Sequence, residues 1–198
     1  MIHRASLRTA ASILKDSPYS RMKNFTIDAD GFCPQANLML SPNRDARPAD
    51  MPIELVVIHN ISLPPNQFGG DGVLQLFTNQ LDANAHPYYA EIHQLKVSAH
   101  FFIRRDGQLW QFVSCLERAW HAGVSQWRQR SACNDFSIGI ELEGSDQQAF
   151  EPIQYKILQN LLVALRARYP IVDIAGHSDI APGRKTDPVP FFDWQKIQ

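Results

Sequence analysis

The sequence predicts a single α/β domain in which a central mixed β-sheet is flanked by helices. Apolar runs of strand length alternate along the chain with segments of helical periodicity, an order typical of α/β domains. Two of these runs are joined by Asp106-Gly107, a hairpin signal that adds an antiparallel pair to the sheet. The chain has 198 residues, enough for one domain with its own core. We expect a sheet of about five or six strands, the usual size.

Five runs are predicted as strands: residues 54–58, 97–103, 109–113, 136–143 and 171–176. The first is apolar on both faces, as expected of a buried central strand, and it stops at His59-Asn60. The second and third flank the Asp-Gly turn. The last ends in Gly176, directly before His177.

Two segments have the periodicity of amphipathic helices. The clearer one spans residues 151–169, where Ile153, Ile157, Leu161 and Leu165 recur at i, i+4 spacing. A proline at position 152 suits its first turn, and a proline at position 170 ends it. The other helix is predicted over residues 73–81. Residues 82–96 are expected to be irregular, and a short surface helix is expected over residues 6–15.

Composition limits the class of protein. Apolar residues make up 44% of the chain and aromatic residues 10%, which excludes intrinsic disorder. The net charge of −1 does not suit a protein that grips many phosphates, so we expect no nucleic-acid partner. No apolar run approaches the ~20 residues that span a bilayer, so we expect no membrane partner. No protein partner is indicated.

The N-terminal residues 1–24 form a basic extension, and residues 25–198 form the predicted domain. Arg8 and Lys15 interrupt every apolar window in the extension, so we expect no secretory signal and a cytoplasmic location. The three cysteines, Cys33, Cys115 and Cys133, are odd in number and widely spaced, which favours reduced thiols over a disulfide framework. A bridge between two of them stays open.

Two histidines and one aspartate lie where a metal site is conceivable. His59 follows a buried strand, His177 follows the last predicted strand, and Asp187 comes ten residues later. Two imidazoles and a carboxylate make a three-ligand zinc site that leaves the fourth position open for catalysis. The spacing alone favours the alternative, because a histidine at a strand end is more often a hydrogen-bonded surface residue.

Glu141 is the candidate acid or base. On a strand, alternate residues share a face, so Phe136, Ile138, Ile140 and Leu142 form an apolar face toward the core. The opposite face carries Ser137, Gly139, Glu141 and Glu143. Small residues beside two carboxylates predict the floor of a cleft, although a solvated sheet edge has the same pattern. Glu141 is the more central of the two carboxylates.

Other polar residues receive structural interpretations. His100 is expected to be a hydrogen-bonding core residue, with a role as a third histidine ligand left open. Arg104 and Arg105 are expected in a solvated turn, with binding of a substrate carboxylate as a lesser alternative. Cys133 is interpreted as a small buried thiol. Surface or packing positions are predicted for the remaining histidines and tryptophans: His86, His93, Trp110, Trp127 and Trp194.

Five motifs occur together and in order: His59-Asn-Ile-Ser-Leu-Pro-Pro65, Val97-Ser-Ala-His100, Arg118-Ala-Trp-His-Ala-Gly-Val-Ser125, Asn134-Asp-Phe-Ser-Ile-Gly-Ile-Glu-Leu-Glu-Gly144 and Lys185-Thr-Asp-Pro188. Together they resemble the zinc-dependent N-acetylmuramoyl-L-alanine amidases, in particular the cytoplasmic enzymes of cell-wall recycling that act on 1,6-anhydromuropeptides. The resemblance spans about residues 37–194. It implies a mixed sheet with flanking helices, shared with phage amidases and peptidoglycan recognition proteins.

The resemblance also implies roles for individual residues. One zinc ion would be bound by His59, His177 and Asp187. Glu141 would be the catalytic acid/base, and Lys185 would stabilise the oxyanion. A muropeptide groove would be lined by Asn60, Trp120 and His121. The implied reaction is hydrolysis of the amide between the lactyl group of muramic acid and L-Ala. Two alternatives remain: a peptidoglycan-binding module without catalysis, and a lytic amidase that acts on polymeric wall.

Overall fold

The computed structural model describes residues 24–197, and its main sheet has six strands in the order β1-β5-β4-β9-β3-β10. These strands are β1 (Asn37–Leu38), β3 (Leu55–Ile61), β4 (Phe101–Ile103), β5 (Leu109–Gln111), β9 (Ser137–Glu143) and β10 (Asp173–Gly176). Neighbouring strands are parallel except for β4 and β5, which form the hairpin predicted at Asp106-Gly107. Gly107 has a φ of +88°, which explains the preference for glycine in that turn. The mixed sheet and its expected size are confirmed.

Four further short strands form two small sheets beside the main one. β2 (Arg44–Ala46) pairs with β6 (Glu117–Ala119), and β7 (Gln126–Trp127) pairs with β8 (Arg130–Ser131). The helices are α1 (Gly72–Phe77), α2 (Pro87–Ile92), α3 (Pro152–Arg168) and α4 (His177–Ile180), with 3₁₀ turns at Cys133–Asp135 and Trp194–Ile197.

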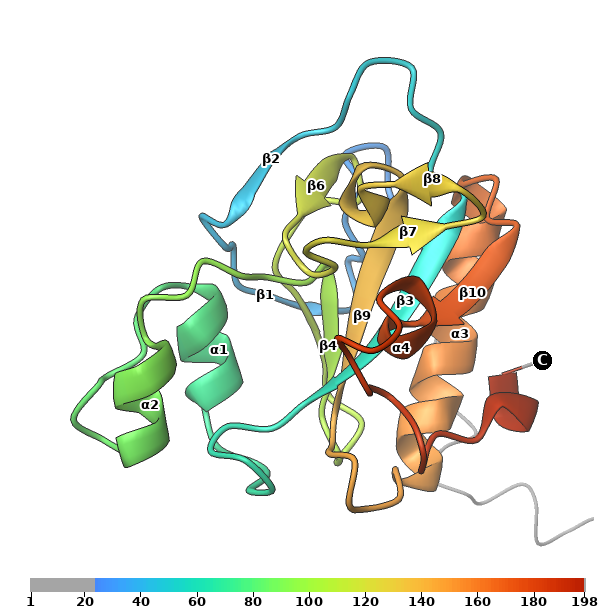
Figure 1. Ribbon diagram of the computed structural model, residues 1–198. Helices are drawn as coiled ribbons and strands as arrows, with labels where there is room; N and C mark the ends of the chain where they lie inside the picture. Colours follow the sequence, from blue (N-terminus) through green and yellow to red (C-terminus); the bar gives the residue numbers. More distant parts are fainter. Residues whose placement is uncertain (1–23, 198) are drawn as a thin grey trace, which may run out of the picture.

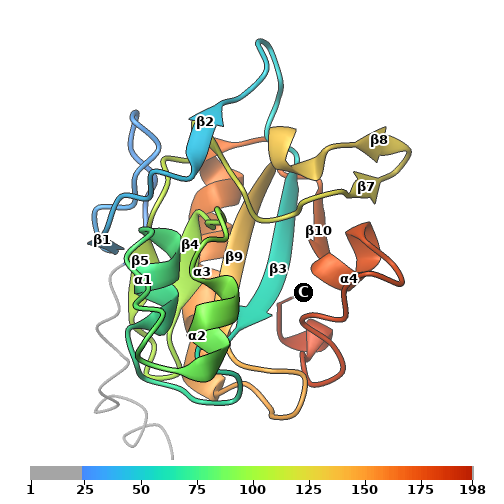
Figure 2. The same cartoon turned by 60° about the vertical axis from the view of Figure 1, so that its left-hand side comes forward.

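The helices cover the two faces of the sheet unequally. α3 lies behind it, whereas α1, α2 and α4 lie in front and leave the middle strands uncovered between them (Figures 1 and 2). The α3 side is the larger core: Ile58, Ile140 and Leu142 of the sheet pack there with Leu158 and Leu161 of the helix. On the front face, α1 packs over β4 and β5. The uncovered part of the front face is where a site can form.

The 151–169 prediction is confirmed by α3. Pro152 occupies the first helical position, and the side chain of Gln154 accepts a hydrogen bond from the backbone N–H of Glu151. Gln154 is fully buried, and its side-chain amide also donates to the carbonyls of Ile103 and Glu143. The first turn of α3 is therefore fixed to the ends of β4 and β9.

Several predicted boundaries were wrong. α1 ends at Phe77 rather than at residue 81, because Asn79 adopts a left-handed φ of +60°. The segment 82–96 is not wholly irregular, since Pro87 begins α2 and the His86 side chain caps it by accepting from the Tyr88 N–H. β3 continues past His59 to Ile61. The basic extension and the helix expected at residues 6–15 lie almost entirely outside the described residues.

All three cysteines are free and buried, which fits the expectation of reduced thiols. Burial raises the pKa of Cys133, as it does for the other two, so Cys133 is the inert thiol that was expected. In the described residues, no helix has the length and apolar character needed to cross a membrane.

Candidate metal centre and active site

Strand register brings the candidate residues together. His59 on β3 is paired with Glu141 on β9, and Ile58 is paired with Gly176 at the end of β10. Paired residues of parallel neighbours point to the same face, so His59 and Glu141 both face the front of the sheet. His177 comes one residue after Gly176 and begins α4, next to His59.

His59, His177 and Asp187 converge on one point. His59 Nδ1 and His177 Nδ1 are 2.9 Å apart, and the Oδ2 atom of Asp187 lies 3.1 Å from His177 Nδ1 and 3.3 Å from His59 Nδ1. Both histidines are almost fully buried. Among residues 24–197 this is the group of histidine, cysteine and acidic side chains with the geometry to hold a metal ion.

The three donor atoms fit zinc. Ligands bound at about 2.0–2.1 Å in a tetrahedral site lie roughly 3.3 Å from one another, close to the separations found here. The orientation of His177 also fits, because its Nε2 lies 3.2 Å from the carbonyl oxygen of Ala122. A carbonyl only accepts, so Nε2 of His177 carries the proton and Nδ1 presents a lone pair to the common centre.

The charge of the group suits a divalent cation. Burial lowers the pKa of His59 to about 4, against the opposing influence of Asp187, so His59 is neutral at pH 7. Burial alone would raise the pKa of Asp187, but its contacts with His177 and His59 outweigh burial and lower it. Asp187 is therefore ionised. A neutral imidazole at His59 and an ionised carboxylate at Asp187 are protonation states that favour zinc binding.

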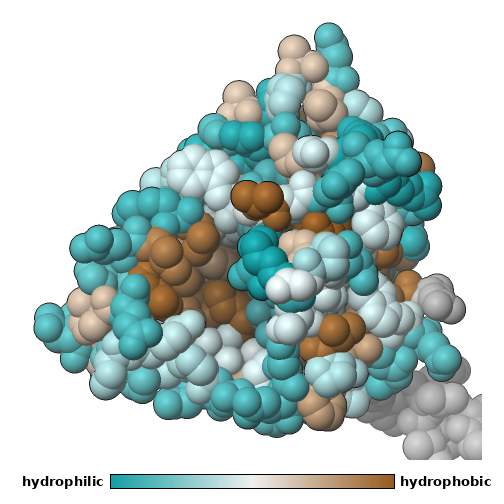
Figure 3. All heavy atoms as spheres, in the orientation of Figure 1, coloured by the Kyte–Doolittle hydropathy of each residue, from teal (hydrophilic) through white to brown (hydrophobic). Residues whose placement is uncertain are grey.

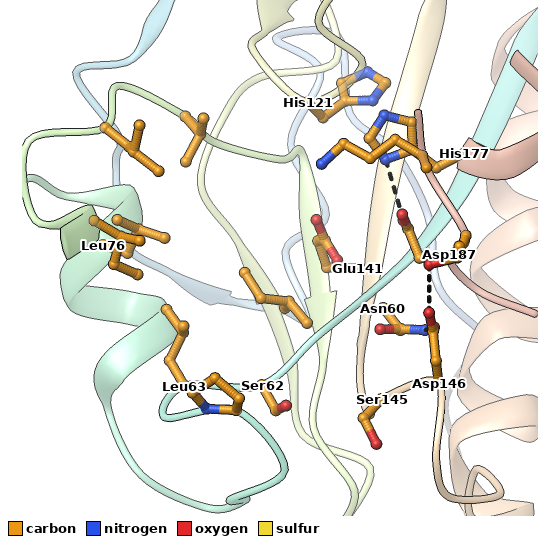
Figure 4. A pocket seen from close by; sticks show the side chains of 18 of the residues that line it. Asn60, Ser62, Leu63, Leu76, His121, Glu141, Ser145, Asp146, His177 and Asp187 are labelled. Carbon is orange, nitrogen blue, oxygen red and sulfur yellow. Dashed lines mark hydrogen bonds and ion pairs between the residues drawn. The ribbon is translucent and has the colours of Figure 1, made fainter. Parts of the chain in front are cut away.

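Glu141 lies beside this group with its carboxyl group turned into the cavity (Figure 4). The residue is only 9% exposed, and its Oε2 atom has no hydrogen-bond partner. Burial raises the pKa of Glu141 well above its ordinary value, nearby Asp187 raises it further, and Lys185 opposes both. A carboxyl group with a raised pKa and a free oxygen is suited to take up and return a proton.

The loop that carries Lys185 and Asp187 is attached to the sheet through Asp146. Asp146 accepts hydrogen bonds from the Asn60 side-chain amide, at 2.8 Å, and from the Thr186 hydroxyl. Thr186 lies between Lys185 and Asp187, so this contact fixes the backbone between the two. Sequence reasoning missed Asp146, and only its place in the turn after β9 could have pointed to it.

The site opens into a cavity of about 480 Å³. On the side of α1 and α2 the cavity is apolar, and the space-filling view shows this half as a brown hollow (Figure 3). Its apolar lining is contributed by Leu63, Leu76, Phe77, Ile92, Leu95 and Val97. The other half is bordered by His177, Asp187 and Lys185. The residues expected to line a groove, Asn60, Trp120 and His121, all border this cavity.

The expected cleft floor is only partly correct. Glu141 reaches the cavity, but Glu143 is buried and accepts hydrogen bonds from the backbone N–H groups of Gly69 and Arg105. Ser137 and Gly139 are covered by the ring of His121, which lies where a Cβ on Gly139 would be. The functional face of β9 is thus reduced to one carboxylate.

Arg104 and Arg105 are not in a solvated turn. Arg104 is 9% exposed and donates to the carbonyls of Gly69 and Gly70 and to the carboxylate of Asp71. Arg105 forms an ion pair with Glu151. Arg104 therefore holds the loop between β3 and α1, and Arg105 holds the start of α3.

His100 is a core residue, as expected. Its Nδ1 accepts from the Gly139 N–H, and its Nε2 lies 3.1 Å from the carbonyl of Glu117. With both ring nitrogens in use, it takes no part in the metal-binding group.

Comparisons with known proteins agree with this geometry. The sequence profile of the N-acetylmuramoyl-L-alanine amidase family matches residues 49–190. The chain belongs to this family.

Similar proteins extend the match over most of the chain. A 1,6-anhydro-N-acetylmuramyl-L-alanine amidase, AmpD, of Citrobacter freundii is 52% identical over 171 residues, which cover 85% of this chain and 91% of the relative. The crystal structure of a selenomethionine derivative of AmpD superposes with a TM-score of 0.83 at 52% identity, covering 85% of this chain and 95% of that one. The amidase AmiD of Escherichia coli, solved with a muropeptide, is 32% identical with a TM-score of 0.55, covering 89% of this chain and 65% of that one.

This protein is accordingly an N-acetylmuramoyl-L-alanine amidase, and the alternative of a non-catalytic binding module does not hold. The amidase fold expected from the motifs is confirmed by the same structures.

Proposed function

We propose that this amidase hydrolyses the amide between the lactyl group of 1,6-anhydro-N-acetylmuramic acid and L-Ala in soluble muropeptides, as a cytoplasmic enzyme of cell-wall recycling. The observation that carries the proposal is that the group His59, His177 and Asp187 lies at a cavity whose lining includes His177, Asp187, Glu141 and Lys185. Relatives named for this substrate are about half identical over 85% of the chain. Three free thiols in the described structure suit a reducing compartment.

The proposed cofactor is one zinc ion, held by His59, His177 and Asp187. Bound there, it would polarise the scissile carbonyl as a Lewis acid and lower the pKa of a water molecule. The chain supplies three ligands, which leaves the fourth position for substrate or water, the pattern of catalytic zinc sites.

The proton transfers fall to Glu141. As the oxygen of water attacks the carbonyl carbon, the free Oε2 of Glu141 takes the proton. Glu141 then returns it to the amide nitrogen and the C–N bond breaks. The second proton of the water leaves the new carboxylic acid for the released amine, so the products are a carboxylate and an ammonium group. Because its pKa is raised, Glu141 holds the proton taken from water more readily than an exposed glutamate would.

Lys185 stabilises the oxyanion that forms on the carbonyl oxygen. Its charge already acts on both Glu141 and His59, which places it beside the reacting group. Asp146 keeps Lys185 there through its contact with Thr186.

The cavity offers binding surfaces for the two parts of the substrate. Asn60, Trp120 and the edge of His121 border it next to the metal-binding group, and we assign them to muropeptide binding. The Trp120 indole is held by a hydrogen bond from its Nε1 to Asp45, at 3.1 Å. AmiD in complex with anhydro-N-acetylmuramic acid-L-Ala-D-γ-Glu-L-Lys is a relative of the same fold with such a ligand.

The test is metal content and product formation on the purified full-length protein. We expect about one zinc per chain, and release of L-Ala-containing peptide from a 1,6-anhydromuropeptide that stops with a chelator and returns with added zinc. Full activity in a metal-free preparation would refute the zinc site.

Intact sacculi serve as the second substrate in the same experiment. We expect far slower peptide release from sacculi than from the soluble anhydromuropeptide. Equal or faster release would favour the lytic amidase that acts on polymeric wall.

A further inference from the structure

His121 contacts a zinc ligand from behind. Its Nδ1 lies 2.9 Å from Nε2 of His59, the ring nitrogen that does not face the metal-binding group. The other nitrogen of His121, Nε2, lies 3.2 Å from the hydroxyl oxygen of Ser137. Three side chains thus form a row that begins in β9 and ends at the proposed metal.

The carbonyl of Cys133, at the end of this row away from the metal, sets the direction of every hydrogen bond in it. The Ser137 hydroxyl lies 2.6 Å from the carbonyl oxygen of Cys133, which can only accept, so the hydroxyl proton points there. The Ser137 oxygen must then accept from Nε2–H of His121. Consequently Nδ1 of His121 carries no proton and accepts from Nε2–H of His59.

This order leaves Nδ1 of His59 with a free lone pair, directed at Nδ1 of His177 and the carboxylate of Asp187. The opposite order would put a proton on that nitrogen and block a metal ion. Gly139 makes the arrangement possible, because a Cβ at this position would lie 2.4 Å from the ring of His121.

We propose that His121 is a positioning residue for zinc binding: together with Ser137 it fixes His59 in the tautomer that ligates the metal. This assigns His121 a role beyond the border of the substrate cavity, and it rests on the zinc site proposed above. Partners that accept from the outer N–H of a ligating histidine raise metal affinity by about 10–100-fold.

Two variants of similar size test the role. His121→Asn places a side-chain oxygen near the position of Nδ1 and keeps an acceptor for His59, whereas His121→Leu has none. We expect zinc affinity, measured by competition with a chelator, to fall by about 10–100-fold in His121→Leu and by only a few fold in His121→Asn. The melting temperature of each metal-free variant is recorded in parallel.

A purely structural role predicts the reverse order. An asparagine placed among buried side chains destabilises a fold more than a leucine does, so damage to the fold would make His121→Asn the weaker zinc binder. Equal affinities of the two variants, or weaker binding by His121→Asn, would overturn the proposal. Wild-type protein that binds no zinc would instead refute the metal site itself.

Discussion

Glu141 is a carboxylic acid in the protein interior with one oxygen, Oε2, that has no hydrogen-bond partner. Such a group is costly to bury, and a fold keeps it only where something offsets that cost. In this amidase the cavity in front of it is where the water and the amide would meet it. The proposed proton transfer gives a reason for this buried carboxyl group that packing does not.

Replacing Glu141 by Gln removes the proton acceptor and keeps the shape of the side chain. We expect kcat to fall by about 10²–10⁴-fold while zinc content stays unchanged, since Glu141 is not among the three ligands. Hydrolysis of the anhydromuropeptide and metal analysis of the same preparation measure both. A variant that turns over at the wild-type rate would remove Glu141 from the mechanism.

Asp45 provides a pH-dependent contribution to stability away from the metal. Its pKa is lowered from 3.8, first by hydrogen bonds from Arg118 and then by the Trp120 indole, against the effect of burial. The folded state therefore prefers the ionised carboxylate. The resulting stability is present above the unfolded value and is lost as pH falls through the lowered pKa.

Asp45→Asn should accordingly be less stable than wild type near neutral pH, with a difference that shrinks as pH falls below about 4. The amide oxygen of Asn can still accept from Trp120, so the ionised pair with Arg118 is what the variant loses. Urea unfolding of both proteins between about pH 7 and pH 3 tests this. A difference that grows toward acid would contradict the assignment.

Elements with strong periodicity were predictable, and several short ones were not. β9 and α3 carry long apolar patterns, and both appear within one or two residues of the predicted bounds. α2 has six residues, and β7 and β8 have two each, too few for a pattern to show. Their formation depends on tertiary contacts with the surrounding chain rather than on a periodic pattern of their own.

Strand alternation pointed to Glu141, but the metal-binding group was favoured over its alternative only through the family motifs. His59 and His177 are 118 residues apart, and no spacing links them. They meet because β3 lies between β9 and β10, which is a property of the sheet order. The packing of His121 against Gly139 likewise depends on how the 120–136 segment folds back over β9.

Gly139→Ala tests how closely that segment fits the strand. The added Cβ would meet the His121 ring at 2.4 Å, so the ring or the backbone must move. We expect a loss of about 1–3 kcal/mol in the free energy of unfolding, typical of overpacking. Weaker zinc binding should accompany it.

Gly70→Ala is the matched control. Its φ is not in the left-handed region, and the nearest atom to its added Cβ is 4.0 Å away. Its stability should stay within about 0.5–1 kcal/mol of wild type. If both variants lose the same free energy of unfolding, the close contact between Gly139 and His121 does not explain the effect of Gly139→Ala.

In the whole molecule, one face of the sheet packs the main core and the other carries the proposed active site. The face under α3 is a continuous apolar core. The other face is apolar at both sides, where α1 and α4 pack, and polar between them, where the proposed catalytic groups lie. Stability and chemistry are thus separated by the thickness of one sheet.

The reactivity of the three buried cysteines tests whether the folded core stays closed. Cys33, Cys115 and Cys133 are each at most 4% exposed, and burial raises the pKa of all three. We expect an aromatic disulfide reagent to titrate almost no thiol in the native protein and three in denaturant without reductant. Fewer than three in denaturant would reveal a bridge, and rapid reaction of the native protein would show that the core opens readily.

The one-to-one pairing of His59 with Glu141 has a consequence for the gene. Strands alternate their faces at every residue, so the loss or gain of a single codon between Ser137 and Glu141 would turn the carboxylate toward α3. Codons added to the turn at residues 147–149, after the strand and Asp146, leave that orientation alone. Insertions and deletions among related genes should therefore occur in the turn and not in the strand, even where substitutions occur within the strand.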